Sequence, residues 1–280
     1  MGTKMEMLFD GGKRKVLTLS YDDGTIHDRR LVAMMNEYGI RGTFNLNSGM
    51  FSQKGTAVIN GYETDMSRIA AEEVKTLYAG HEVASHTLTH PSLTTLPSNM
   101  GAAEVLKDRK NLEELTGELV RGFAYPYGTY NETVEEVLSA CGIEYARTVV
   151  DTNGFDLPAD FLEWHPTCHH ESQSLMEIAK DFCENDGYSA RLFYLWGHSY
   201  EFTQKNNWQM IEDFFKYVSK YREQIWMATN IELVDYVKSF RELRRSTDGV
   251  ILYNPTGMDL WFELDGQTKC IHGKEKLSFH

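Results

Sequence analysis

Two acidic residues and two histidines have the types and spacing of a metal site with a spare carboxylate. Asp22 and Asp23 follow the β-rich stretch 16–21 and precede a glycine, which predicts both at the end of a strand. His86 and His90 follow a second short, strand-like stretch. One carboxylate and two imidazoles leave positions open for water and substrate on a zinc-like ion, which is typical of catalytic zinc. The other aspartate is then free to transfer protons.

Each half of this pattern also has an ordinary structural explanation. Asp-Asp-Gly is common in turns, where the aspartates bond to nearby backbone and glycine takes a positive φ. Two histidines four residues apart often share a solvated helix face. Here Gly80 is predicted to end a helix, and Thr87, Thr89 and Pro91 disfavour a new one. Both motifs therefore fall at strand ends, and this shared position favours a functional site.

Four motifs make the chain similar to the NodB-type polysaccharide deacetylases, carbohydrate esterase family four, over about residues 14–240. Ser-Tyr-Asp-Asp-Gly at 20–24 resembles the first motif of that family, and 86–90 resembles the second. Phe-Ala-Tyr-Pro-Tyr-Gly at 123–128 resembles the third, and Leu-Trp-Gly-His at 195–198 is similar to the last.

The resemblance implies a role for each motif residue. The implied general base is Asp22, the implied general acid is His198, and the implied metal ligands are Asp23, His86 and His90. The ion would be one divalent metal, zinc in the first place, with cobalt or nickel as alternatives. The resemblance also implies that the Tyr127 backbone amide stabilises the oxyanion.

The third motif departs from the family pattern, because Ala124 stands where an arginine usually holds the base aspartate. Arg121 and Arg147 are the nearest replacements by position. The odd spacing from Arg121 to Ala124 places them on opposite faces of a regular strand. We therefore hypothesise that Arg147, at the end of the next strand, orients Asp22.

The fourth motif is not recoverable from the sequence. Trp164 is the candidate for its apolar side chain, and Tyr125, Tyr127 and Tyr200 are candidates for contact with sugar rings because they adjoin motif residues. His165, His169 and His170 cluster near Cys168. We expect these histidines to shape the pocket rather than bind a second metal, since they lack a carboxylate partner at a defined spacing.

Short apolar strands alternate with amphipathic helices along most of the chain. Strands are predicted at 16–21, 42–47, 82–86, 121–125, 144–149, 163–168, 191–197 and 224–228. Helices are predicted near 27–38, 65–79, 97–115, 132–140, 173–185, 204–220 and 230–243. This alternation predicts an α/β fold, a distorted parallel (β/α) barrel of seven or eight strands, with a doubly wound open sheet as the alternative. The barrel is favoured because the candidate residues all follow strands.

The pattern changes near residue 246. Strand-like segments and an Asp265-Gly266 turn signal predict a small C-terminal β appendage at 246–280, after a catalytic barrel at 1–245. The appendage is too short to be stable alone, so we expect it to pack on the barrel or on a second subunit.

Composition limits the other functions open to this chain. Among 280 residues, 41% are hydrophobic and 25% are charged, which is ordinary for a globular protein. The formal net charge of −13 disfavours nucleic acid as a partner. The four cysteines form no Cys-x-x-Cys pair, and no stretch has the length of a signal peptide core or a membrane span. A cytoplasmic location is the resulting expectation.

These features predict metal-assisted hydrolysis of the acetamide of an N-acetylated amino sugar in a poly- or oligosaccharide. In this prediction Asp22 removes a proton from water and His198 protonates the departing amine. Two alternatives stay open. One is an amidase acting on a small non-sugar amide with the same scaffold, and the other is a catalytically inactive sugar-binding relative.

Overall fold

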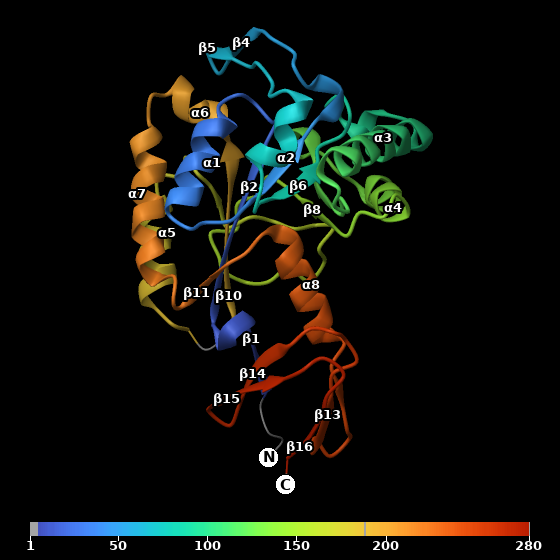
Figure 1. Ribbon diagram of the computed structural model, residues 1–280, viewed down its shortest axis with the longest axis vertical. Helices are drawn as coiled ribbons and strands as arrows, with labels where there is room; N and C mark the ends of the chain where they lie inside the picture. The colour runs from blue at the N-terminus through green and yellow to red at the C-terminus, as the bar shows by residue number, and fades with distance from the viewer. Residues whose placement is uncertain (1–4, 188, 280) are drawn as a thin grey trace.

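A curled parallel sheet surrounded by helices forms the larger part of the protein (Figure 1). The computed structural model describes residues 5–187 and 189–279. The sheet order is β8-β7-β6-β3-β2-β10-β9, and β11 pairs with β2 beside this path. The strands are β2 (Lys15–Asp22), β3 (Thr43–Leu46), β6 (Glu82–Ser85), β7 (Gly122–Ala124), β8 (Tyr145–Arg147), β9 (Cys168–His169), β10 (Arg191–His198) and β11 (Ile225–Met227). The predicted distorted parallel barrel is confirmed.

An irregular segment joins the two edges of this sheet. Trp164 pairs in parallel with Arg147 of β8, and its backbone N and O bond to Ala146 and Thr148 at 3.0 Å. A few residues later, β9 pairs with β10 at the opposite edge. The predicted strand 163–168 is therefore reduced to two short pairings, which makes the barrel irregular here.

Helices surround the sheet in chain order. They are α1 (Asp28–Glu37), α2 (Val74–Leu77), α3 (Ser98–Thr116), α4 (Glu132–Ala140), α5 (Leu175–Glu184), α6 (Ser199–Gln204), α7 (Trp208–Val218) and α8 (Asn230–Arg241). The predicted helix 204–220 is divided into α6 and α7, because Asn206 between them has a φ of 50° that no helix continues. Within the described ranges, no helix combines the length and apolar character needed to cross a membrane.

Strand β2 lies in the middle of the sheet and positions the acidic pair. All of its residues are buried, as expected for a parallel strand covered on both faces. The strand ends at Asp22, and the chain then turns sharply, because Asp23 has a φ of 81°. The turn separates the directions of the two carboxylates.

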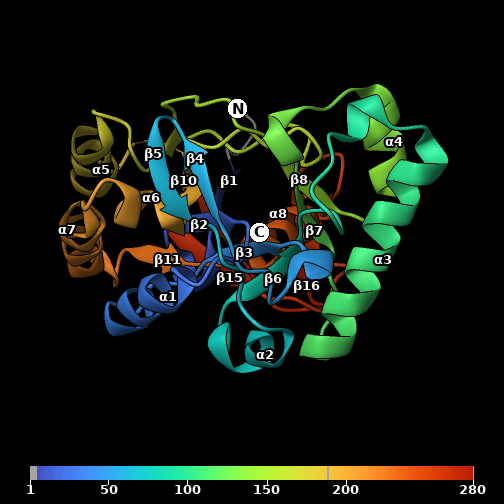
Figure 2. The ribbon, with the colours of Figure 1, turned by 90° about the horizontal axis from the view of Figure 1, so that it is seen from above.

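A hairpin that the sequence analysis did not predict rises above the carboxyl ends of the strands (Figure 1, Figure 2). It consists of β4 (Thr56–Ile59) and β5 (Tyr62–Asp65), joined by Asn60 and Gly61. Both turn residues have positive φ, 50° and 85°, which is the geometry that Asn-Gly favours in two-residue hairpins. The start of the predicted helix 65–79 is lost to this hairpin and its return loop.

Two small antiparallel sheets lie at the opposite end of the molecule, where both termini are found (Figure 1). One contains β1 (Met5–Leu8), β14 (Leu260–Leu264) and β15 (Gln267–Ile271). The other contains β12 (Arg244–Arg245), β13 (Ile251–Tyr253) and β16 (Lys276–Ser278). The C-terminal sheets thus include β1 and β12, two segments that lie before residue 246.

Helix α8 connects these sheets to the barrel. The Thr229 hydroxyl and the Glu232 carboxylate form a capping box at its first turn. Further along, the Tyr236 hydroxyl donates to Leu8 O at 2.7 Å and accepts from Trp261 N at 2.9 Å. One cluster of buried side chains runs from the barrel interior into the appendage, and its members include Trp164, Tyr194, Leu233, Leu260, Phe262 and Ile271. The barrel and the C-terminal sheets therefore share one core.

Candidate active site

The candidate residues meet at the carboxyl ends of the barrel strands. Asp22, Arg147 and His198 are the last residues of β2, β8 and β10. His86 directly follows β6, and Tyr127 lies in the turn after β7. Residues from separate strand ends converge on one face of a parallel barrel, where active sites of such barrels are found.

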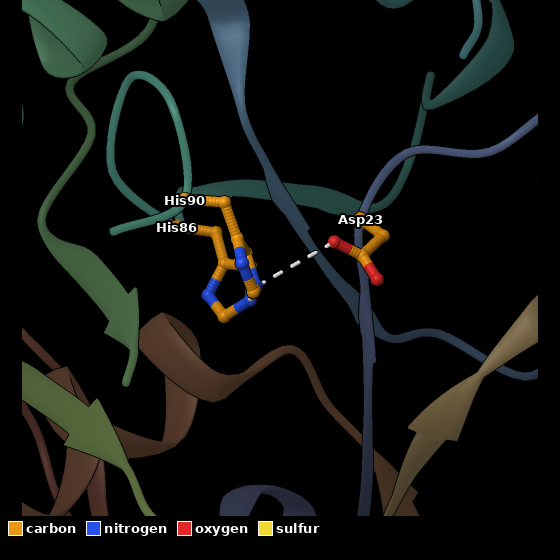
Figure 3. A group of neighbouring side chains, drawn as sticks. All are labelled: Asp23, His86 and His90. Atoms are coloured by element: carbon orange, nitrogen blue, oxygen red, sulfur yellow. Dashed lines mark hydrogen bonds and ion pairs between the residues drawn. The ribbon is translucent and has the colours of Figure 1, made fainter. Parts of the chain in front are cut away.

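Asp23, His86 and His90 bring three ligand atoms together (Figure 3). The Nε2 atoms of the two histidines are 3.1 Å apart, and His90 Nε2 lies 3.8 Å from Asp23 Oδ1. Ligands bound tetrahedrally at about 2.0–2.1 Å are roughly 3.3 Å from one another. The trio therefore has the spacing to hold one divalent cation.

The protonation of these residues also suits a cation. His86 Nδ1 lies 2.7 Å from Ala124 O, so this nitrogen carries the proton and the Nε2 lone pair faces the site. Burial lowers the pKa of His86 to about 4, which keeps the ring neutral at neutral pH. Among the described residues, Asp23 Oδ1 is buried and has no hydrogen-bond partner. Such an orphaned oxygen is costly unless an ion or water satisfies it.

Asp22 lies beside the trio and has different partners. Its Oδ1 accepts a 2.8 Å hydrogen bond from Asn45 Nδ2, and its Oδ2 forms an ion pair with Arg147 Nη2. The same Oδ2 lies 4.0 Å from His86 Nε2 and 3.9 Å from His198 Nε2. Burial by itself would raise the pKa of Asp22, but Arg147 and the two histidines outweigh it and lower the pKa. Asp22 is thus ionised and oriented at neutral pH.

The structure brings together the two residues that the sequence analysis paired across the altered third motif. Arg147 is fully buried, and its guanidinium also lies over the Trp196 ring at 4.5 Å. Arg121 instead pairs with Glu144 and Asp235 at the start of β7. Ala124, where the family arginine would stand, contributes its carbonyl oxygen to His86.

His198 faces Asp22 with one nitrogen and a carboxylate with the other. Its Nδ1 lies 3.3 Å from Glu201 Oε2, and its backbone N–H donates to the same oxygen at 3.0 Å. Burial opposes protonation of His198, yet Glu201 and the two aspartates raise its pKa to about 9. The ring is therefore protonated at neutral pH, with Nε2–H directed at the site.

Glu201 is the carboxylate partner that the histidine cluster lacked in the sequence. Its Oε2 lies 3.2 Å from His169 Nε2 and 3.4 Å from His170 Nε2. His169, His198 and Glu201 are close enough for a second ion. However, His169 Nδ1 accepts the Glu171 N–H at 3.2 Å, which leaves the proton on Nε2. A protonated Nε2 donates to Glu201 and does not ligate a metal.

The other two histidines of the cluster also have defined surroundings. His170 is fully buried and stacks on Phe202, with ring centroids 4.1 Å apart. A Cβ at Gly197 would lie 2.0 Å from His170 Nδ1, so only glycine leaves room for this ring. His165 lies apart from Glu201 and contacts the Thr148 hydroxyl at 2.7 Å.

The aromatic candidates divide into one exposed residue and three buried ones. Tyr127 is 66% exposed, and its ring contacts His90 edge-on at 4.6 Å. Trp164 is fully buried against Tyr145, Phe161 and Tyr194, so its predicted contact with substrate is wrong. Tyr125 is also buried, and its hydroxyl donates to Leu162 O at 2.8 Å, which makes it a core residue. Tyr200 is 6% exposed beside His198.

Sequence reasoning missed four residues that contact the site. They are Asn45, Arg68, Trp196 and Glu201. Asn45 is a polar residue inside a buried apolar strand, directly opposite Asp22 in the register, and this is a readable signal. Glu201 lies three residues after His198, within reach of the first turn of a helix. Arg68 and Trp196 had no signal in the sequence, since loop and ring packing place them.

The geometry agrees with the comparison to known proteins. The sequence model of the family described as polysaccharide deacetylase matches residues 10–146, which include the acidic pair, both candidate metal histidines and Tyr127. The chain belongs to the polysaccharide deacetylase family. His198 and Glu201 lie outside the matched range, so only the tertiary structure connects them with the family motifs.

Relatives within the family are distant. The chain is 27% identical over 155 residues to chitin deacetylase 1 of Cryptococcus neoformans, covering 54% of this chain and 30% of that protein. It is 25% identical over 143 residues to a chitooligosaccharide deacetylase of Sinorhizobium fredii, covering 50% and 60%. The chain thus spans less than two thirds of the length of these curated relatives.

Solved structures support the fold. A Mycobacterium smegmatis structure described as a polysaccharide deacetylase superposes with a TM-score of 0.63 at 15% identity, covering 88% of this chain and 98% of that one. Peptidoglycan deacetylase PdaC from Bacillus subtilis gives a TM-score of 0.52 at 18% identity, covering 82% and 94%. At these identities the agreement concerns the family fold.

Proposed function

We propose that this protein is a metal-dependent hydrolase that removes the acetyl group from an N-acetylated amino sugar in a poly- or oligosaccharide. The observation that carries this proposal is the arrangement of a base and an acid around an open metal trio. Asp22 Oδ2 lies within 4.0 Å of both His86 Nε2 and His198 Nε2. A binding protein has no need for an ionised carboxylate and a protonated imidazole at such a site.

Asp23, His86 and His90 would hold the ion, which we propose to be zinc because a mixed oxygen and nitrogen ligand set with open positions suits that metal. The bound ion would supply Lewis acidity for the acetyl carbonyl and for an attacking water.

Asp22 would accept the proton of that water. Arg147 and Asn45 hold the two oxygens of its carboxylate, so the base is ionised and fixed before substrate arrives. Fixed partners of this kind lower the reorganisation needed in the reaction.

His198 would donate the proton that the departing amine requires. Glu201 binds its Nδ1 and keeps the opposite nitrogen directed at Asp22 and the site. We assign stabilisation of the oxyanion to the Tyr127 backbone amide, which the turn after β7 presents beside His90. Together these groups suit hydrolysis of an amide, whose poor leaving group needs an acid.

The names of the relatives support the substrate class. Chitin, chitooligosaccharide and peptidoglycan deacetylases are all among them. Chitin, chitooligosaccharides and peptidoglycan share N-acetylated amino sugars, so we propose this unit as the one that the protein recognises.

Acetate release from chitooligosaccharides and peptidoglycan fragments tests the proposal, with zinc, cobalt or nickel added to chelator-treated protein. Asp23→Ala, His86→Ala and His90→Ala should each lose bound metal and activity, because each removes one of three ligands. Asp22→Asn and His198→Ala should retain metal but lower turnover by roughly 10²–10⁴. Undiminished metal content in all three ligand variants would reject the site. Acetate release from none of these substrates would reject the substrate class.

A further inference from the structure

Arg68 is a buried guanidinium that contacts a proposed metal ligand. Its side chain is 7% exposed, and its Nη1 lies 3.1 Å from Asp23 Oδ1. The same nitrogen donates to the Asp23 backbone oxygen. Arg68 follows the β4–β5 hairpin, so the segment that carries this hairpin also carries a cation to the site.

The backbone around Arg68 is bonded to the loop after the acidic pair. Arg68 and Thr25 form an isolated antiparallel bridge. Ile69 N donates to Gly24 O at 3.0 Å, and Ile26 N donates to Ser67 O at 2.9 Å. Asp23 keeps a φ of 81°, a conformation that costs a non-glycine residue free energy and persists only where its surroundings enforce it. Arg68 is part of that enforcement.

The charges of the site are balanced before an ion arrives. Asp22 pairs with Arg147, and Asp23 pairs with Arg68. A divalent cation at Asp23, His86 and His90 is then attracted by Asp23 and repelled by Arg68. A group bonded to a ligating carboxylate also reduces the electron density that the carboxylate gives to the metal.

We propose that Arg68 is a positioning residue that holds Asp23 in place and, through its charge, weakens the hold of the site on its ion, so that the bound ion stays a strong electrophile. This inference rests on the proposed function, because it takes Asp23 as a ligand. It separates two effects of one side chain. Its shape orients the ligand, and its charge lowers the affinity for metal.

The test measures zinc affinity by competition with a chromogenic chelator at one pH and ionic strength. Arg68→Gln keeps a donor for the Asp23 backbone oxygen but removes the charge, and we expect it to bind zinc about tenfold more tightly than the unaltered chain. Arg68→Lys keeps the charge and should bind with the unaltered affinity. Arg68→Met is a second neutral variant, in case Arg68→Gln does not fold. Arg29→Gln, which removes an exposed ion pair with Glu73, is the matched control.

Activity and the absorption spectrum of the cobalt-loaded protein complete the test. Tighter zinc binding with a lower kcat in Arg68→Gln, and a changed cobalt spectrum, would support the inference. A merely structural role would instead weaken binding in the neutral variants. Equal or weaker binding there would overturn the inference while leaving the proposed function intact. An unaltered chain that binds no divalent ion would overturn the proposed metal site itself.

Discussion

The two adjacent aspartates differ in every partner that they have. Asp22 is held by Arg147 and Asn45, and Asp23 lies between His90 and Arg68. Burial would raise the pKa of either carboxyl, and the adjacent arginine lowers it in each case. Neighbouring residues on the chain can therefore serve as base and ligand, because the turn at Asp23 points them at different groups.

Replacing Arg147 should expose the dependence of the base on its cation. In Arg147→Lys the bidentate-capable guanidinium is lost, and burial then raises the pKa of Asp22. The ionised base is lost at a higher pH, so the acidic limb of kcat/KM should move to higher pH and the rate should fall by roughly 10²-fold. Steady-state kinetics across pH would show this, with metal content unchanged. Arg121→Lys is the control, and a profile unchanged in Arg147→Lys would make Arg147 purely structural.

Replacing Glu201 should act on the opposite limb. His198 has its pKa raised to about 9, so its protonated form is present below that pH and lost above it. Glu201→Gln removes the principal charge that favours protonation, and the alkaline limb of kcat/KM should move to lower pH. Acetate release measured between neutral and alkaline pH would show the shift. Loss of bound metal in this variant would contradict the assignment, because it would place Glu201 among the ligands.

At the scale of elements, the barrel depends on the segment that joins β8 to β10. Trp164 pairs with the backbone of β8 while its ring packs against Tyr145, Phe161 and Tyr194. The Asp22 partner Arg147 is the residue opposite Trp164 in this pairing. Closure of the barrel and orientation of the base thus depend on the same few residues.

Trp164→Ala should therefore reduce stability rather than substrate binding. Removing a fully buried tryptophan from a core costs about 3–5 kcal/mol of unfolding free energy. Chemical denaturation would measure this loss, and KM should stay within about twofold of the unaltered value where the variant is folded. Leu119→Ala, at a surface leucine, is the control. A raised KM at unchanged stability would restore Trp164 to the substrate site.

At the scale of the whole molecule, the C-terminal sheets complete the core of the barrel. Strand β1 pairs with β14, and α8 contacts both through the Tyr236 hydroxyl. Leu260 and Phe262 of β14 are fully buried in the cluster that also holds Trp164. We propose that residues 246–280 are one structural unit with the barrel and not an independent domain.

A chain ending at Arg245 tests this proposal. It would leave β1 without a partner and expose the apolar side chains that face β14, so we expect it to lose cooperative unfolding. Thermal unfolding followed by circular dichroism, together with zinc binding, is the measurement. Unfolding at the unaltered temperature with intact metal binding would show that the barrel folds alone.

The sequence by itself determined the barrel strands, the motif residues and the side of the barrel on which they meet. Strand and helix periodicity depend on neighbours along the chain, and parallel strands bring their carboxyl ends to one face. Asp22, Asp23, His86, His90 and His198 could be placed for this reason. Arg147 could be proposed because an altered motif left Asp22 without its usual partner and a strand end lay nearby.

The tertiary structure alone decided which side chains turn toward the site. Trp164 and Tyr125 face the core because barrel closure buries them, and no local pattern separates a buried aromatic side chain at the rim from an exposed one. Arg68 reaches Asp23 through a hairpin whose return path is set by long-range hydrogen bonds. Glu201 separates the histidine cluster from metal binding through the tautomer of His169, which depends on a single backbone N–H. Such contacts join residues distant in sequence, and only the folded chain brings them together.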